Sequence, residues 1–128
     1  MNNNDPITEG KPFALIIEDD FDAAEIIDEA LLMAGFETEI IRDGKMALAR
    51  LTEIVPNVIT LDLHLPHASG IEILQHIRGD KRLEKVPVMV VTADARLIDQ
   101  AESMANLVLI KPASFNQVRL FAQRLSRM

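Results

Sequence analysis

Five short apolar or alternating runs recur along the chain, and each is followed by a segment with helical periodicity. Three of them are wholly apolar, one contains a single polar residue, Thr60, and one alternates polar with apolar residues; the five are Phe13–Ile17, Glu37–Arg42, Val58–Leu61, Val88–Val91 and Leu107–Ile110. A short apolar run without alternation is typical of a strand covered on both faces of a sheet. Strands that alternate with helices predict an α/β fold with a parallel sheet between two helical layers.

The alternating run at 37–42 is expected to lie at an edge of the sheet, because one of its faces is partly polar. Right-handed crossovers leave few possible strand orders, and the flavodoxin-like, doubly wound order 2-1-3-4-5 puts the second strand at an edge. The same order puts the wholly apolar fifth strand at the other edge, where helices or a partner must cover it. We therefore predict a flavodoxin-like sheet of five parallel strands with five helices.

Capping residues mark several of the expected helix boundaries. Asp20 is interpreted as the cap of the first helix rather than as a metal ligand, and Gly35 as the residue that ends this helix. Ser114–Gln117 is a capping-box pattern that opens the last helix. The segment at 79–85 is interpreted as an exposed connection between the third helix and the fourth strand.

The composition limits the classes of protein and of site that are possible. The chain has 128 residues, which is enough for one domain and too few for two. It has no cysteine, which excludes disulfides and thiolate metal sites and fits a reducing, cytoplasmic setting. The net charge of −7 argues against direct nucleic-acid binding, and no apolar run approaches the length of a membrane span. We expect a flexible leader at 1–10 and one domain at 11–128.

Acidic residues stand directly after two of the predicted strands. Glu18 and Asp19 follow the first strand, and Asp62 follows the third. In the order 2-1-3-4-5 these strands are neighbours at the point where the winding reverses, and ligands bind beyond the carboxyl ends there. Thr92 and Lys111 end the fourth and fifth strands at the same edge. We expect three carboxylates, a hydroxyl and an amine to share one pocket.

This combination of side chains suits a divalent cation and a phosphoryl group. Clustered carboxylates repel one another, so at least one pKa would rise without a countercharge. Mg²⁺ prefers oxygen ligands and commonly pairs with phosphate. Phosphoryl transfer depends mainly on positioning and on charge neutralisation, to which Lys111 contributes. Because a carboxylate can act as the nucleophile, we predict that Asp62 does so and that Mg²⁺ is the cofactor.

Four motifs in order, "LIIEDD", "VITLDLHLPHASG", "VMVVTA" and "LIKP", resemble the receiver domain of two-component response regulators. One such motif carries little weight, but the four at appropriate separations are specific together. The resemblance covers nearly the whole chain. It implies a signalling domain, not an enzyme, that takes a phosphoryl group from a histidine kinase or phosphotransfer protein and switches a protein-binding surface.

The resemblance also implies roles for the acidic residues. Asp62 matches the residue that accepts the phosphoryl group. Asp19 matches a direct Mg²⁺ ligand, and Glu18 an acid that acts on the metal through water. The backbone carbonyl of His64, two residues after Asp62, matches a further metal ligand.

On the phosphate side, Thr92 matches the hydroxyl that turns toward the phosphoryl group, and Ala93 a neighbouring contact. Lys111 matches the lysine that pairs with the phosphate. The bond between Lys111 and Pro112 is expected to be cis because of the resemblance, since only about 5% of X–Pro bonds are cis in general.

Three features depart from the usual receiver pattern. Val108 stands where receivers usually carry an aromatic residue that swings inward as the threonine moves. The span from Thr92 to Lys111 is short by about one helical turn, so the fourth helix should be short or displaced. Ala113 stands where a large apolar residue is common. All three lie on the face of helix four, strand five and helix five, which is also where a homodimer is possible.

Two alternatives from other classes stay open. The first is a pseudo-receiver adaptor that keeps the fold for binding alone, which Val108 and the shortened fourth helix favour and the complete pocket opposes. The second is a phosphatase with an aspartate nucleophile, but such enzymes normally carry a second acid where this chain has His64. The chain is expected to be either a stand-alone regulator or a piece of a longer protein.

Overall fold

The structure is a computed structural model that describes residues 10–126. The leader expected at 1–10 lies, apart from Gly10, outside the described residues. The strands are β1 (Phe13–Ile17), β2 (Glu37–Ile41), β3 (Val58–Leu61), β4 (Val88–Thr92) and β5 (Leu107–Ile110). The helices are α1 (Phe21–Met33), α2 (Gly44–Leu51), α3 (Gly70–Gly79), α4 (Ile98–Glu102) and α5 (Phe115–Ser126), with a 3₁₀ turn, η2 (Ala95–Leu97), before α4.

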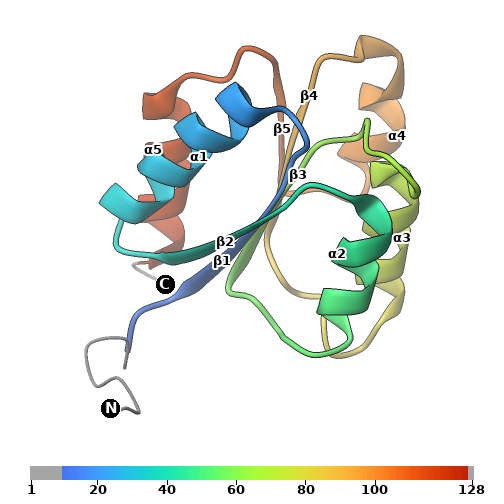
Figure 1. Ribbon diagram of the computed structural model, residues 1–128, viewed down its shortest axis with the longest axis horizontal. Helices are drawn as coiled ribbons and strands as arrows, with labels where there is room; N and C mark the ends of the chain where they lie inside the picture. Colours follow the sequence, from blue (N-terminus) through green and yellow to red (C-terminus); the bar gives the residue numbers. More distant parts are fainter. Residues whose placement is uncertain (1–9, 127–128) are drawn as a thin grey trace.

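The strands form one parallel sheet in the order β2-β1-β3-β4-β5, which confirms the predicted topology. Helices α1 and α5 lie on one face of this sheet, and α2, α3 and α4 lie on the other (Figure 1). Helix α1 packs against α5, while α3 contacts both α2 and α4. The polar strand β2 is at one edge and β5 at the other, as expected.

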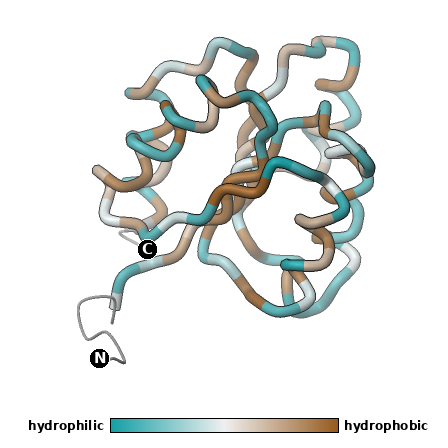
Figure 2. Tube along the Cα trace, viewed as in Figure 1, coloured by the Kyte–Doolittle hydropathy of each residue, from teal (hydrophilic) through white to brown (hydrophobic). Residues whose placement is uncertain are grey.

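Each face of the sheet carries its own hydrophobic core. Leu15 and Ile17 of β1 belong to the core under α2 and α3, whereas Ala14 and Ile16 belong to the core under α1 and α5. Successive strand side chains point to opposite faces, so a strand covered on both sides is apolar along nearly its whole length. Figure 2 shows the hydrophobic colouring concentrated along the central strands. The two edge strands are less covered: β2 is half-buried up to Ile41, and β5 is half-buried and ends in Ile110, which is 55% exposed.

The expected helix caps are present. The Asp20 side chain accepts hydrogen bonds from backbone amides at the start of α1, and Gly35 follows that helix with a φ of 95°. Ser114 and Gln117 exchange both hydrogen bonds of a capping box before α5. A second capping box, between Ser69 and Glu72, opens α3 and was not predicted.

The connection between α3 and β4 is not simply exposed, and the interpretation of 79–85 was wrong in this respect. Leu83 is fully buried because its side chain joins the core under α2 and α3. Arg78, near the end of α3, donates to the carbonyls of Glu84, Val86 and Met104 and to the side chain of Asn106. Arg78 thereby joins the α3–β4 connection to the α4–β5 connection.

Helix α4 has five residues, which agrees with the short fourth helix expected from the sequence. Within residues 10–126, none of the helices has the length and apolar character needed to cross a membrane.

Candidate functional site

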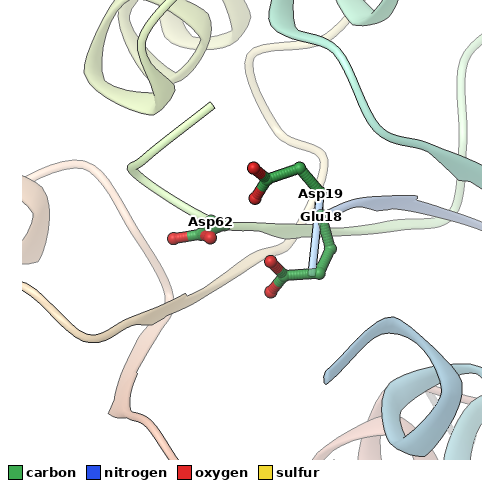
Figure 3. A group of neighbouring side chains, drawn as sticks. All are labelled: Glu18, Asp19 and Asp62. Atoms are coloured by element: carbon green, nitrogen blue, oxygen red, sulfur yellow. The ribbon is translucent and has the colours of Figure 1, made fainter. Parts of the chain in front are cut away.

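The three predicted carboxylates converge at the carboxyl ends of β1 and β3. Ile17 pairs with Leu61 across the two strands, so the residues that follow them emerge side by side. One oxygen from each of Glu18, Asp19 and Asp62 lies within 4.8 Å of the others. Figure 3 shows the carboxylates of these residues pointing into a common space. Glu18 and Asp62 are buried, at 1% and 4% exposure, whereas Asp19 is exposed.

Lys111 reaches this cluster from the end of β5. Its Nζ donates to Glu18 Oε2 at 2.9 Å and to Asp62 Oδ2 at 3.0 Å. Burial alone would lower the pKa of Lys111, but the hydrogen bonds to the two carboxylates raise it above its ordinary value. Lys111 is therefore a charged amine held between two acids, and its peptide bond to Pro112 is cis, as expected.

Glu18 is the most perturbed acid of the cluster. Burial, together with its contact with Asp62, raises the pKa of Glu18 to about 8, although Lys111 opposes the shift. Glu18 Oε2 accepts from Lys111, whereas Oε1 is buried and has no hydrogen-bond partner among the described residues. A buried carboxylate oxygen without a partner is rare in folded proteins, and a cation at this position would satisfy it.

Thr92 ends β4 and pairs with Ile110 of β5, so Thr92 and Ala93 lie next to Lys111. Thr92 is fully buried at the end of β4, and its carbonyl accepts a hydrogen bond from the Lys111 backbone at 2.9 Å. The Thr92 hydroxyl oxygen accepts from the Asp94 backbone at 3.1 Å, which leaves its own proton available to a further acceptor. Ala93 is exposed.

His64 belongs to the rim of the site. Its backbone N–H donates to Asp62 Oδ1 at 3.2 Å, so both oxygens of Asp62 already have partners. Its ring, which is 61% exposed, lies 2.8 Å from Asp94 Oδ2 through Nε2. The sequence assigned a role to the backbone of His64 only, and the contact of its side chain was missed.

Asp94 is a site residue that sequence reasoning did not identify. Its side chain is 8% exposed and accepts from Arg96 through Nε and Nη2 at 2.9 and 2.8 Å. The Arg96 contact, and then the His64 contact, lower the pKa of Asp94 well below its ordinary value. An acid two residues after a strand end and at the start of a helical turn is an N-cap signal, and this signal could have pointed to Asp94.

Glycine allows the loop after Asp62 to close on the site. A Cβ atom added to Gly70 would lie 2.3 Å from the carbonyl oxygen of Asp62 and 2.5 Å from Leu63 Cα. No side chain fits this contact without a backbone shift. Gly70 therefore lets α3 begin directly against the strand end that carries Asp62.

The two atypical residues are Val108, within β5, and Ala113, in the segment that follows it. Val108 is half-buried and packs against the core under α2 and α3. Ala113 helps to line a cavity of about 300 Å³ between α1 and the segment after β5, which Lys111 also borders.

Residues 14–123 match the response regulator receiver domain family. The transcriptional regulatory protein YrkP of Bacillus subtilis, which is described as uncharacterized, is 38% identical over 90 residues, covering 70% of this chain and 37% of YrkP. The chain spans about half or less of the length of such curated relatives, and 52% of the regulator RpaA of Synechocystis.

Two solved structures are similar over nearly the whole chain. The phosphorylated cyanobacterial phytochrome response regulator RcpA has a TM-score of 0.78 and 26% identity, covering 92% of this chain and 93% of RcpA. The Mn²⁺-bound form of the response regulator Rcp1 has a TM-score of 0.72 and 28% identity, covering 91% and 93%. These similarities agree with the fold.

Proposed function

Since the chain belongs to the receiver domain family of two-component response regulators, we propose that Asp62 accepts the phosphoryl group. The observation that carries this proposal is the convergence of Asp62 with two other acids and Lys111. Asp62 has one carboxylate oxygen 3.0 Å from Lys111 Nζ, and it shares a cluster of oxygens within 4.8 Å with Glu18 and Asp19.

The donor set of the pocket fits Mg²⁺. It consists of carboxylate oxygens, which Mg²⁺ prefers, and it contains the buried, unpartnered Oε1 of Glu18. We propose Asp19 and Asp62 as direct ligands, the backbone carbonyl of His64 as a third, and Glu18 as a ligand through water. When bound, Mg²⁺ supplies positive charge that neutralises the clustered carboxylates and the phosphoryl oxygens. The Mn²⁺-bound form of the similar regulator Rcp1 supports a divalent cation at this pocket.

In the proposed reaction an oxygen of Asp62 forms a bond to the phosphorus of a phosphohistidine. The bond from phosphorus to the histidine nitrogen breaks, and its electron pair stays on that nitrogen. Lys111 neutralises charge beside the phosphoryl group, and the free hydroxyl proton of Thr92 and the backbone of Ala93 are proposed contacts for its oxygens. A histidine kinase or a phosphotransfer protein is the proposed donor.

Receiver domains are signalling domains rather than typical enzymes, so the proposed result of phosphorylation is a changed protein-binding surface. The exposed Ile110 of β5 and Leu120 of α5 support a partner or a second copy at the α4–β5–α5 face. The relatives include regulators described as DNA-binding, but the net charge of −7 favours protein contacts for this domain. A cytoplasmic location also stays a proposal.

Acetyl phosphate with Mg²⁺ tests the proposal directly. Intact-mass spectrometry should show the gain of one phosphoryl group by the wild-type chain and no gain by the Asp62→Asn variant. Asp99→Asn, a change at an exposed acid of α4, is the matched control and should gain the group normally. A folded wild-type chain that gains no phosphoryl group with Mg²⁺ would favour the adaptor alternative, which the complete pocket opposes.

A further inference from the structure

Two loops on either side of Asp62 are joined by a side-chain bridge. The loop after β3 contributes His64, and the loop after β4 contributes Asp94, with 2.8 Å between His64 Nε2 and Asp94 Oδ2. Arg96 holds the same carboxylate through two further hydrogen bonds. These residues are named the His64–Asp94–Arg96 bridge.

The bridge is connected at both ends to the proposed phosphoryl site. On one side, the backbone N–H of His64 donates to Asp62 Oδ1 at 3.2 Å. On the other side, the backbone N–H of Asp94 donates to the Thr92 hydroxyl oxygen at 3.1 Å. If Asp62 or Thr92 changes its hydrogen-bond partners, the backbone of His64 or of Asp94 therefore loses a contact, and the side chains of these two residues form the bridge.

The bridge is also the anchor of the segment that follows β4. Asp94 is the N-cap of η2, where its side chain accepts from the Arg96 backbone at 3.0 Å. Helix α4 follows at once, has five residues, and has no side-chain cap of its own. A helix this short depends on tertiary contacts for its position. Among the described residues, Asp94 supplies the side-chain cap that fixes the start of the η2–α4 segment.

We propose that Asp94 is a positioning residue that couples the phosphorylation state of Asp62 to the η2–α4 segment (95–102) through the His64–Asp94–Arg96 bridge. This proposal rests on the proposed function, because it requires Asp62 to accept the phosphoryl group. When the phosphoryl oxygens draw the partners of Asp62 and Thr92 toward themselves, the bridge makes both loops move together. The η2–α4 segment then follows, since its cap is part of the bridge.

His64→Ala separates this coupling from a purely structural role of the cap. It removes the ring, but it leaves the backbone N–H that contacts Asp62 and leaves Asp94 as the cap of η2. His76→Ala, at an exposed histidine on α3, is the matched control. Asp94→Asn is the second variant, because asparagine also caps helices well and therefore tests the charge without removing the cap.

The measurement is the amide NMR spectrum of the full chain with Mg²⁺, before and after beryllofluoride, which mimics the phosphoryl group. We expect the amides of both Asp62 and 95–102 to shift in the wild type and in His76→Ala. In His64→Ala and Asp94→Asn the amides near Asp62 should still shift, whereas the response of 95–102 should be clearly smaller than in the wild type, because only the backbone link from Asp94 to Thr92 remains. A double-mutant cycle on beryllofluoride affinity should show coupling between the two positions of roughly fivefold or more.

The outcomes separate the inference from the proposed function. If beryllofluoride shifts no amide near Asp62 in the wild type, the proposed function fails and the inference fails with it. If the site amides shift but 95–102 does not respond in the wild type, only the inference is overturned. A full response of 95–102 in His64→Ala, or independent effects of the two variants, overturns it as well.

Discussion

The junction of β1 and β3 and the side formed by β5 and α4 differ in how completely the chain covers them. Strand β3 is buried throughout, as is β1 after its first residue, and Glu18 and Asp62, which follow these strands, are buried too. Strand β5 is half-buried and ends in the exposed Ile110, while α4 has half the length of α3. The proposed chemistry thus lies on the well-packed part of the fold, and the proposed binding surface on the thinly covered part.

This difference follows from what each region has to do. Phosphoryl transfer needs groups held within a fraction of an ångström, and buried strand ends provide such rigidity. A surface that changes partners needs low local stability, which comes from few buried contacts. The two regions should therefore differ in their contributions to the free energy of unfolding as they differ in burial.

The largest effect is expected from Arg78→Ala, because Arg78 compensates for the thin cover on the β5 side. The change removes four hydrogen bonds that join the α3–β4 and α4–β5 connections. Carbonyls that lose a buried donor remain partly unsatisfied, so the free energy of unfolding should fall by about 3 kcal/mol. Urea unfolding measures the change.

Arg50→Ala is the matched control for Arg78→Ala. Arg50 forms a bidentate ion pair with Glu39, but both side chains are about one-third exposed. Such a pair should contribute less than about 1 kcal/mol. Equal losses in the two variants would contradict the anchoring role assigned to Arg78.

The second prediction concerns the buried acids of the β1–β3 junction in the absence of Mg²⁺. The pKa of Glu18 is raised from 4.5 to about 8, so the folded state holds one more proton than the unfolded state between these values. The stability that this protonation provides is fully present below pH 4.5 and is lost as the pH rises toward 8. Between pH 5 and pH 7 the free energy of unfolding should fall by about 2–3 kcal/mol.

Thermal or urea unfolding at several pH values without Mg²⁺ measures this slope. Glu18→Gln should flatten it, because a neutral amide does not titrate. Added Mg²⁺ should restore stability to the wild type at pH 7, since it binds the folded state alone. A wild-type slope equal to that of Glu18→Gln would show that the buried acid is not destabilising.

The sequence was sufficient to predict the well-covered region, and on the β5 side it predicted the edge strand and the short α4, but not the side-chain contacts that hold this side together. Apolar strands followed directly by Glu18 and Asp62 indicate the topology and the pocket together, because parallel strand ends meet at one edge. The contacts of Asp94, Arg96 and Arg78 were missed, since they depend on how short loops cross rather than on periodicity. Leu83 was placed wrongly because the residues around it are mostly charged, so the sequence pattern of the connection did not indicate that one of its residues is buried.

Val108→Tyr tests how much room the β5 side offers. Val108 is half-buried against the core under α2 and α3, so a larger ring must displace its neighbours. Overpacking of this kind should reduce the free energy of unfolding by about 1–2 kcal/mol. Val108→Ile, which adds one carbon, should cost less in the same urea experiment. An unchanged or increased stability of the tyrosine variant would show that this side has space for an aromatic residue.

The smallest effects are expected from the two capping boxes, which offer one matched pair between the regions. Ser69 with Glu72 opens α3 beside the site, and Ser114 with Gln117 opens α5 after β5. Replacing either serine by alanine removes one hydrogen bond to an otherwise unpaired helix amide, at a cost of about 1 kcal/mol. The Glu72 carboxylate also interacts with the positive end of the α3 dipole, which the neutral Gln117 cannot do for α5.

Ser69→Ala and Ser114→Ala should therefore lower the free energy of unfolding, measured with urea, by nearly equal amounts. Glu72→Gln, made alone, should lower it by a few tenths of a kcal/mol, and at low salt only. Salt should remove this last difference because it screens the dipole interaction at an exposed position. If Ser114→Ala were instead without cost while Ser69→Ala cost the full amount, the start of α5 would already be loose. The low stability of the β5 side would then extend beyond α4 to the helix that completes the proposed binding face.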